Sequence, residues 1–597
     1  MGIFSNFRET FESIVEFRKL LAYTSSIDAE SDNLITDDFE RSIDKHRHNA
    51  YCRFEGQIWS YDDLETYANR IAHWAQAQGI GRGDTVALLS ENCPEYVGVW
   101  FGLSKIGAIS ALINHNLQGQ ALTHCVDIAE AKAVIVGPEN IAELNAVRDD
   151  LKGAPSLWGL GAEPDGGQDL SPVLETMSSE RPDRSVREGL KADATVLNVY
   201  TSGTTGLPKA ACLSHTRVQW MTRTFVTPTK ASSRDRIYLT LPLYHSTGGM
   251  CGVGAALNSG ACIILRRKFS ATHFWQEATE QGATIIVYIG ELCRYLLNAP
   301  KTEYDTAHKV RTGFGNGLRP DIWQAFLDRF EVDKLVEFYG STEGNVSFLN
   351  VNGKVGAVGH IPKILEHKVS HIRFVKFDIE SEMPVRGEDG FCIEAEPGEP
   401  AEVIGQLGEG STARFDGYKD EEATKKKILT DVFEKGDQWF RTGDLLKKDE
   451  NGYVYFVDRI GDTYRWKGEN VSTNEVSEVL ATHDNVALAN VYGVPIAGMD
   501  GKAGMAALTL QGELKFESLR QWLGDQLPSY AVPLFLRIQS DAETTGTMKY
   551  RKVDLVKDGF NPARVSDPIW FLHPDAKEYR PLTHDDYDTI MAGGYRF

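Results

Sequence analysis

Short apolar runs rich in β-branched residues alternate with longer helical patterns from about residue 50 onwards. Six runs are typical of buried strands: 84–90, 131–137, 196–201, 237–243, 262–267 and 284–290. Strands that alternate with helices indicate stacked βαβ units, because parallel neighbours need a helical crossover between them. The alternation therefore predicts an α/β fold, and the apolar run 96–113 predicts a helix that ends near Asn114.

The pattern changes twice towards the C-terminus. Short strands and turns follow residue 380, and a small α+β unit begins near residue 461. We expect a helical lead over 1–45, a large domain of stacked βαβ sheets with a β-rich subdomain over 46–460, and a small C-terminal domain over 461–597. The Gly/Pro/Ser/Asp-rich segment 161–185 predicts a surface loop, and the lysines of 425–427 predict a solvated helix face.

Charge and cysteine usage exclude several classes of protein. The formal net charge is −21, which makes a nucleic-acid partner unfavourable. The 8 cysteines form no CxxC pair and no zinc-like cluster, so we expect reduced thiols in a cytoplasmic protein. Ser104, Lys105 and Ser110 interrupt the longest apolar run, so no membrane-spanning helix is predicted.

The first 21 residues predict an amphipathic helix and no signal peptide, because charges occur throughout and a small-residue cleavage site is missing. Its apolar residues recur at helical spacing: Phe4, Phe7, Phe11, Ile14 and Val15. Two interpretations stay open. The helix packs on its own protein, or it lies in a membrane interface, which would place the protein peripherally on the inner face of a membrane.

The segment 200–215 contains the most informative loop. Four hydroxyl residues and two glycines precede Lys209 directly after an apolar strand. Glycines let backbone N–H groups approach phosphate oxygens, while hydroxyls and a lysine add donors and charge. The spacing differs from a Walker loop, and a simple Ser/Thr turn is the alternative. The glycine run 313–320 is by itself typical of a turn.

Five blocks then occur in one order: TSGTTGLPK (201–209), EFYGSTEGN (337–345), FRTGDLL (440–446), FVDRIGD (456–462) and TTGTMKYRK (544–552). Together they resemble the adenylate-forming superfamily of acyl-CoA synthetases and luciferases. Further segments are similar to the very-long-chain acyl-CoA synthetases, also called fatty acid transport proteins: 92–117, 289–298, 462–476 and 567–582. The resemblance extends over roughly residues 50 to 597.

The resemblance implies a two-step ligase. A long- or very-long-chain fatty acid would react with ATP to give acyl-AMP and pyrophosphate, and CoA would then displace AMP. Because two anions meet in the first step, the site must provide positive charge and orientation, and the implied cofactors are ATP, Mg²⁺ and CoA. A mobile C-terminal domain is part of the same expectation.

The resemblance also implies individual roles. The β- and γ-phosphates would be bound by Thr201, Ser202, Gly203, Thr204, Thr205, Gly206 and Lys209. Thr201 and Glu343 would bind magnesium, and Thr342 would bind the α-phosphate. The adenine would contact Tyr339, Gly315, Asn316 and Gly317, and the ribose would contact Asp444 and Arg459.

Lys549 matches the mobile catalytic lysine of the family, although Met548 replaces the usual preceding glycine, so Lys552 keeps a claim to that role. Gly461 is a plausible hinge residue. Gly468 would allow close approach of the pantetheine arm.

His245 and the glycine-rich run that follows it can each be interpreted in two ways. His245 is either a gate before the acyl pocket or a structural histidine. The glycine-rich run 248–260 either opens an acyl tunnel or forms a tightly packed helix.

There are three alternatives to the ligase. They are an adenylation enzyme that loads a carrier protein in trans, a fatty-acid uptake protein that acts by vectorial acylation, and a luciferase-like oxygenase, which no motif favours. The sequence determines neither acyl chain length nor oligomeric state.

Overall fold

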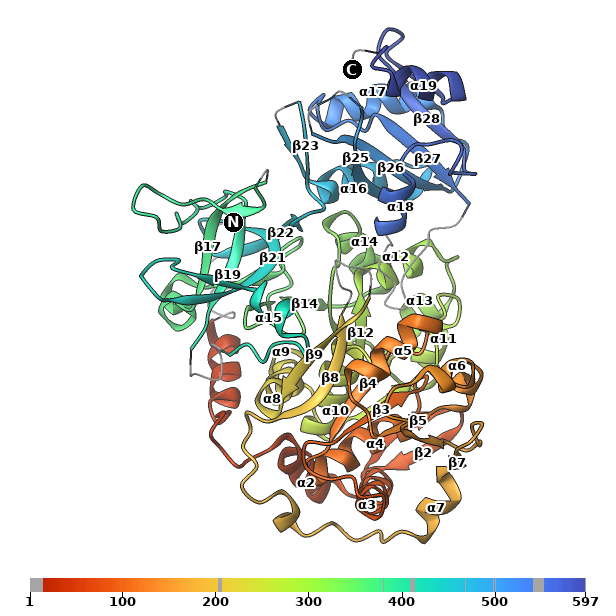
Figure 1. Cartoon of the computed structure of the whole chain (residues 1–597), viewed down its shortest axis with the longest axis vertical. Helices are drawn as coiled ribbons and strands as arrows, with labels where there is room; N and C mark the ends of the chain where they lie inside the picture. The colour runs from red at the N-terminus through yellow and green to blue at the C-terminus, as the bar shows by residue number, and fades with distance from the viewer. Residues whose placement is uncertain are drawn as a thin grey trace.

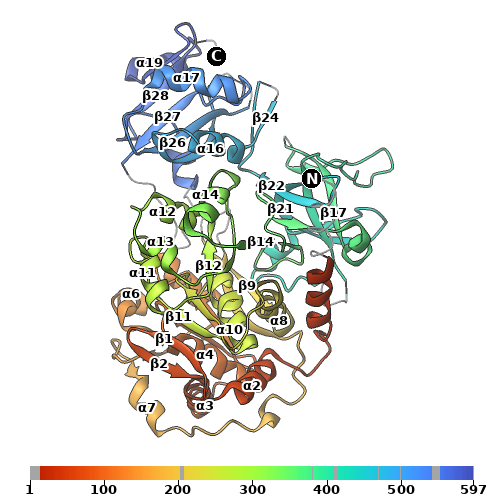
Figure 2. The same cartoon turned by 180° about the vertical axis from the view of Figure 1, so that it is seen from behind.

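The computed structural model describes residues 14–201, 207–379, 381–408, 414–467, 469–497, 499, 501–540, 552–595 and 597. Within these residues, two mixed sheets form the body, a third, antiparallel β-sheet lies beside them, and the C-terminal part lies at one end of the long axis (Figures 1 and 2). This arrangement confirms the predicted α/β class with a large N-terminal part and a small C-terminal part.

The first sheet has the order β7-β6-β5-β3-β4-β8-β9, parallel except for the antiparallel pair β8–β9. Its strands are β3 (Thr85–Leu89), β4 (Ile109–Ile113), β5 (Ala133–Val136), β6 (Ser156–Gly159), β7 (Gln168–Asp169), β8 (Thr195–Thr201) and β9 (Lys209–Ser214). The connecting helices are α3 (Tyr61–Ala77), α4 (Pro94–Lys105), α5 (Gly119–Ile128), α6 (Ile141–Val147) and α7 (Leu170–Thr176), with short 3₁₀ turns at Pro138–Asn140, Arg148–Asp150 and Arg184–Arg187.

The second sheet has the order β15-β14-β13-β12-β10-β11-β1-β2. Its strands are β1 (Ala50–Phe54), β2 (Gln57–Ser60), β10 (Arg236–Leu239), β11 (Cys262–Leu265), β12 (Ile285–Ile289), β13 (Thr312–Asn316), β14 (Lys334–Gly340) and β15 (Ser347–Asn350). Its helices are α2 (Ile35–His46), α8 (His215–Thr224), α9 (Val226–Thr229), a π-helix (Ser246–Gly252), α10 (Val253–Ser259), α11 (Phe274–Glu280), α12 (Gly290–Asn298), α13 (Tyr304–Ala307) and α14 (Pro320–Phe330).

The third sheet is antiparallel and has the order β16-β22-β21-β19-β17-β18, with β20 paired to β21. Its elements are β16 (Gly359–His360), a 3₁₀ helix (Lys363–Val369), β17 (Ile372–Asp378), β18 (Met383–Pro384), β19 (Ala401–Gln406), α15 (Glu421–Lys425), β20 (Ile428–Thr430), β21 (Gln438–Lys448) and β22 (Tyr453–Arg459). This is the β-rich part that the sequence pattern predicts after residue 380.

The C-terminal part packs around its own hydrophobic cluster. It begins with the hairpin β23 (Tyr464–Trp466) and β24 (Glu469–Val471). A sheet of β25 (Val486–Val494), β26 (Ala503–Leu510), β27 (Phe535–Gln539), β28 (Ile569–His573) and β29 (Glu578–Pro581) follows, with α16 (Thr473–Ala481), α17 (Phe516–Gln526), α18 (Lys552–Asp558) and α19 (His584–Met591). A separate core is what allows such a part to move as a unit.

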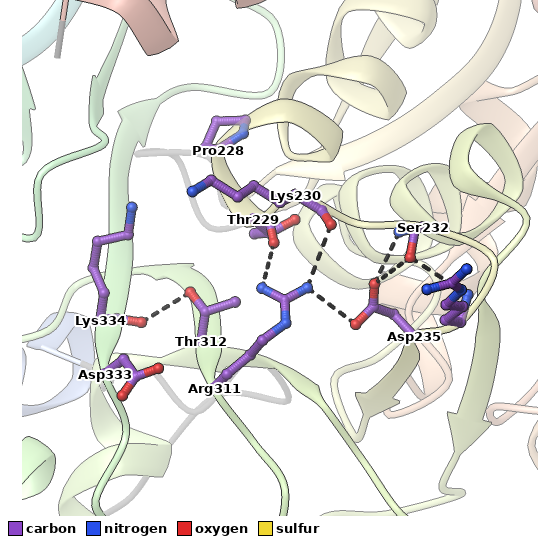
Figure 3. A pocket seen from close by; sticks show the side chains of 10 residues that line it. Pro228, Thr229, Lys230, Ser232, Asp235, Arg311, Thr312, Asp333 and Lys334 are labelled. Carbon is purple, nitrogen blue, oxygen red and sulfur yellow. Dashed lines mark hydrogen bonds and ion pairs between the residues drawn. The ribbon is translucent and has the colours of Figure 1, made fainter. Parts of the chain in front are cut away.

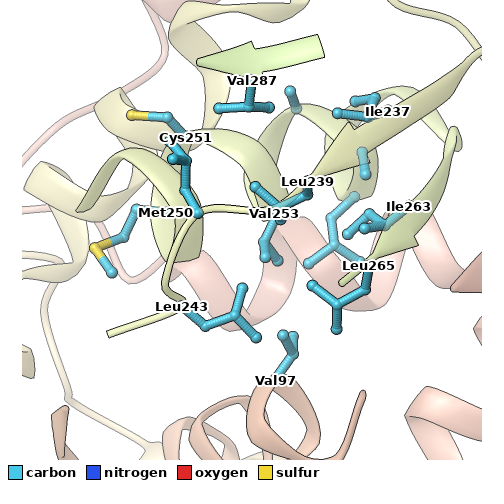
Figure 4. Packing of buried hydrophobic residues seen from close by; sticks show 14 of the residues in the cluster. Val97, Ile237, Leu239, Leu243, Met250, Cys251, Val253, Ile263, Leu265 and Val287 are labelled. Atoms are coloured by element: carbon cyan, nitrogen blue, oxygen red, sulfur yellow. The ribbon is translucent and has the colours of Figure 1, made fainter. Parts of the chain in front are cut away.

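One continuous apolar cluster joins the first two sheets. Figure 4 shows Val97 of α4 facing Leu239 of β10, Leu265 of β11 and Val253 of α10. Side chains from both sheets therefore share one core, and the carboxyl ends of their strands are held in a fixed relation.

Two sequence predictions are wrong in detail. The apolar run 96–113 is divided: α4 ends at Lys105, Gly107 adopts a φ of +72°, and β4 then pairs in parallel with β3. Periodicity cannot separate a buried helix from a buried strand that follows it directly. The segment 161–185 contains α7, which buries Leu170 and Leu174, so it is only partly a surface loop.

Ion pairs anchor residues 181–187 to the body. The ammonium of Lys105 is fully buried and lies 2.8 Å from Glu40 and 3.0 Å from Glu65. Arg181 pairs with Glu65, and Arg187 pairs with Glu40. A fully buried ammonium such as that of Lys105 is stable only because it has charged partners.

The described part of the N-terminal helix, 14–24, packs on its own protein. Leu20 joins the main apolar cluster, and the Arg223 guanidinium lies 5.9 Å from the ring centroid of Tyr23. Phe4, Phe7 and Phe11 lie outside the described residues. For these three residues, both interpretations of the helix therefore stay open.

Candidate functional site

Tyr339 and Asp444 meet where the second sheet approaches the third. The Tyr339 hydroxyl donates to Asp444 Oδ2 at 2.7 Å. Asp444 is also paired in the β21–β22 ladder with Arg459, whose Nε lies 3.8 Å from Asp444 Oδ1. Burial, and secondarily the charge of Asp444, raise the pKa of Tyr339, so the phenol remains a donor and the carboxylate an acceptor.

The end of β13 forms the neighbouring wall. Gly315 and Asn316 close the strand, and Gly317 adopts a φ of +80°. Among the described atoms, Asn316 Oδ1 is buried without a hydrogen-bond partner. A buried amide oxygen of this kind fits a ligand donor such as an exocyclic amino group.

Glu337 lies behind this wall and holds it in place. Its Oε1 accepts from the Leu318 N–H at 3.0 Å, and its Oε2 accepts from the Tyr288 hydroxyl at 2.7 Å. Burial raises the pKa of Glu337 to about 8. The motifs do not single out Glu337. The signal that could have revealed it is a carboxylate within the otherwise apolar stretch Leu335–Tyr339.

The loop after β14 is fixed by α8 and by the π-helix. Arg217 donates to the Ser341 carbonyl at 2.6 Å and to the Thr342 carbonyl at 3.2 Å. The Thr342 hydroxyl lies 3.2 Å from Ser246 Oγ. The Thr342 side chain is thus positioned from two sides.

Glu343 connects this loop to the first sheet. It is 8% exposed, and its Oε1 accepts from the Tyr418 hydroxyl at 2.5 Å. The Lys209 ammonium lies 5.8 Å from the centroid of the Tyr418 ring, and Lys209 pairs with Thr201 across β8 and β9. Glu343 is therefore linked through Tyr418 to Lys209, at one end of the hydroxyl-rich loop, and Lys209 pairs with Thr201 at the other end. Tyr418 carries no sequence pattern that would have revealed this contact, which joins residues 75 positions apart.

Several predicted site residues lie outside the described residues: Ser202, Gly203, Thr204, Thr205, Gly206, Gly468 and Lys549. Lys552 is described, and its ammonium donates to Asp462 at 3.1 Å and to the Thr473 hydroxyl at 2.8 Å. These bonds hold Lys552 beside the segment that contains Gly461.

The glycine run 248–260 forms a tightly packed helical segment. A Cβ on Gly249 would lie 1.9 Å from the Leu243 carbonyl oxygen, so only glycine fits there. Thr247 N–H donates to His245 Nδ1 at 3.4 Å, so His245 caps the π-helix. Of the two interpretations of this run, the structure favours close packing.

A separate hollow of about 540 Å³ lies at the other end of β13 and β14 (Figure 3). Arg311 spans it and pairs with Asp235 at 3.0 Å. Thr312 and Lys334, at the amino ends of the two strands, line it. Tyr339 and Asn316 lie at the carboxyl ends, so the hollow is not part of the site described above.

In the part of the chain that the structure describes, no helix has the length and apolar character needed to cross a bilayer. The same residues contain no group of three or more His, Cys, Asp or Glu side chains arranged around a metal.

Two family models match the chain. The AMP-binding enzyme model covers residues 39–390, and the model of the AMP-binding enzyme C-terminal domain covers residues 475–549. The chain is therefore an AMP-binding enzyme.

The chain is also similar to individual proteins of known name. Long-chain fatty acid transport protein 6 of Mus musculus is 41% identical over 565 residues, which is 94% of this chain and 90% of the relative. Long-chain fatty acid transport protein 1 of the same species is 42% identical over 547 residues, with 90% and 84% covered. The chain belongs to the family of the long-chain fatty acid transport proteins.

Solved structures share the fold. An anthranilate CoA ligase in complex with anthranoyl-AMP superposes with a TM-score of 0.77 at 20% identity, covering 91% of this chain and 100% of that one. A fatty acyl CoA synthetase of Mycobacterium tuberculosis gives a TM-score of 0.63 at 22% identity, with 88% and 99% covered.

Proposed function

We propose that this chain is an ATP-dependent ligase that converts a long- or very-long-chain fatty acid to acyl-AMP and then transfers the acyl group to CoA. The observation that carries the proposal is a set of contacts made by β14 and the loop after it: Tyr339 bonds to Asp444, and Glu343 bonds to Tyr418, whose ring lies beside Lys209. The names of the relatives support the acid substrate, since they are long-chain fatty acid transport proteins.

In the first step, a carboxylate oxygen of the acid attacks the α-phosphorus of ATP, the bond between the α-phosphorus and the bridging oxygen breaks, and pyrophosphate leaves. Lys209 and the loop 201–206 bind the β- and γ-phosphates. Asp444 accepts hydrogen bonds from the ribose hydroxyls with Arg459 beside it, and Asn316 Oδ1 accepts from the adenine amino group. Thr342 donates to the α-phosphate, and Lys549 reaches the reacting oxygens.

Glu343 and Thr201 fit a magnesium site. Glu343 offers a buried carboxylate whose partner Tyr418 lies beside Lys209 at one end of the phosphate loop, and magnesium prefers a few oxygen ligands together with phosphate and water. When bound, the ion neutralises charge on the β- and γ-phosphates.

In the second step, the CoA thiolate attacks the acyl carbonyl carbon and AMP leaves. We assign this step to a movement of the domain 461–597 relative to 46–460, with 1–45 as a lead. Gly461 adopts a φ of +91°, a conformation that glycine adopts without strain. Gly468, two residues after the buried Trp466 in the sequence, is the glycine that we assign to the pantetheine arm.

The cellular setting is part of the proposal. The protein acts in the cytoplasm and collects its substrate at the inner face of a membrane through peripheral contact. Conversion of the acid to its CoA ester then drives uptake of the acid. An acyl carrier protein, loaded in trans, is the alternative to CoA as acceptor of the acyl group.

The test is a pyrophosphate-release screen of saturated acids of increasing length, with and without CoA, on the full chain. We expect turnover to rise towards long acids and to give acyl-CoA when CoA is present. Asp444→Ala, the matched control, should lose both signals. Turnover of short acids alone, or none with any acid, would contradict the proposal.

A further inference from the structure

Lys427 is the third residue of the lysine run that the sequence pattern assigns to a solvated helix. Its two neighbours agree with that assignment: Lys425 and Lys426 are exposed, and Lys425 pairs on the surface with Glu422 at 2.9 Å. Lys427 differs, because α15 ends at Lys425 and the chain turns into β20. The Lys427 carbonyl accepts from the Arg441 N–H at 2.8 Å, which directs its side chain beneath the Thr442–Asp444 turn.

The ammonium of Lys427 is held in a specific place. It donates to the Thr442 carbonyl at 3.1 Å and lies 5.7 Å from the centroid of the Phe440 ring. A Cβ at Gly443, whose φ is +78°, would lie 3.3 Å from it. The turn that carries Asp444 therefore closes directly over this cation.

The charges that act on the pKa of Lys427 are those of Glu343, Asp444, Glu402 and Arg441. Glu402 is already paired with Arg441, whose Nη2 lies 2.8 Å from Glu402 Oε2. The other two carboxylates that act on Lys427 are Glu343 and Asp444, of which Asp444 also lies 3.8 Å from Arg459. Burial lowers the pKa of Lys427 and these carboxylates oppose that effect. A partly buried ammonium costs free energy, which an apolar side chain at this position would not.

We propose that Lys427 is a resident phosphate-binding residue of the nucleotide site, and that its ammonium contacts the α-phosphate. The inference rests on the proposed function, which gives Asp444 to the ribose and Glu343 to the metal at the β- and γ-phosphates. In ATP, the α-phosphate is the group that joins these two parts. Lys427 lies under the turn that carries Asp444, and the charge of Glu343 also acts on it. Its ammonium would therefore offset the negative charge that builds up on the α-phosphate as the carboxylate attacks. Unlike Lys549, it belongs to the large part of the chain and is present in both steps.

The experiment measures the binding of ATP, AMP and adenosine to the full chain by calorimetry. In Lys427→Met we expect ATP and AMP to bind about 10-fold or more weakly, as for the loss of a charged hydrogen bond, and adenosine to bind within about twofold of wild type. Lys427→Arg should recover part of the loss. Lys426→Met is the matched control and should bind all three ligands as wild type does.

Three outcomes separate the possibilities. An equal loss for adenosine would mean that Lys427 only positions the Asp444 turn, and unchanged ATP and AMP binding would mean that it does not touch the nucleotide. Either result overturns the inference. Failure of the wild type to bind ATP would instead overturn the proposed function.

A second measurement covers the case in which Lys427→Met does not fold. Wild-type protein is treated with an amine-acetylating reagent and its lysines are examined by mass spectrometry. AMP should protect Lys427 and adenosine should not, while Lys426 reacts in every sample. Equal protection by adenosine, or no protection by AMP, would contradict phosphate contact.

Discussion

The Tyr339 hydroxyl donates to Asp444 Oδ2 at 2.7 Å and thereby joins two strands that are 105 residues apart in the sequence. Tyr339 belongs to β14 of the second sheet and Asp444 to β21 of the third. A ligand that contacts both residues must lie between the two sheets. The orientation of Asp444, for which we propose a ribose-binding role, therefore depends on a residue of the other sheet.

Tyr339→Phe should weaken ATP binding while leaving the fold intact. The phenylalanine keeps the ring but removes one hydrogen bond to a carboxylate, so we expect KM for ATP to rise about 5- to 20-fold with a smaller change in kcat. Steady-state kinetics at saturating acid and CoA measure this. Tyr455→Phe is the control, because it removes a 3.2 Å hydrogen bond from Tyr455, in β22 of the third sheet, to the carboxylate of Asp449. A KM within twofold of wild type would argue against a role of this pair in orienting the ribose.

Glu343→Gln should raise the magnesium concentration needed for half-maximal pyrophosphate release by about 10-fold or more, because a neutral amide is a poor ligand for a hard cation. The amide keeps the size of the side chain and can still accept from Tyr418. Glu366→Gln, at an exposed pair with Lys448, is the matched control. If the magnesium titration of Glu343→Gln superposes on that of wild type, Glu343 is not a ligand.

Lys549→Ala and Lys552→Ala should separate the two half-reactions. Positive charge at the reacting oxygens is needed while two anions approach, so Lys549→Ala should lose acid-dependent pyrophosphate release by about 100-fold and still convert supplied acyl-AMP and CoA to acyl-CoA. Lys552 is bonded to Asp462 and Thr473, so its replacement should spare adenylation. The reverse pattern would transfer the catalytic role to Lys552.

Glu337→Gln should remove a pH dependence of stability. The pKa of Glu337 is about 8 in the folded chain and about 4.3 in an unfolded one. Between these values the folded state keeps a proton that the unfolded state has lost, so wild-type stability falls as pH rises through this window. The amide cannot ionise, so the variant should gain stability relative to wild type from pH 5 to pH 8. Urea unfolding of both proteins at these two pH values measures the difference. A constant difference would show that Glu337 is ionised in the fold.

Local sequence determined much of this protein. The six predicted strands occur as β3, β5, β8, β10, β11 and β12, because the apolar composition of a buried strand is a local property. Family motifs likewise identified the class of enzyme, since their residues are contiguous. The run 96–113 was misread because apolar pattern alone does not separate a buried helix from the strand after it.

Only the tertiary structure decided which residues meet. The lysine run 425–427 shows this within three positions: the local pattern describes Lys425 and Lys426 correctly, whereas pairing of β20 with β21 turns Lys427 under the Asp444 turn. The contact of Tyr418 with Glu343 and that of Glu337 with the Leu318 N–H also join separate elements. The sequence determined the periodicities and the motifs because both depend on neighbouring residues. The contacts of Tyr418, Lys427 and Glu337 depend on how three sheets pack against one another, which no local pattern encodes.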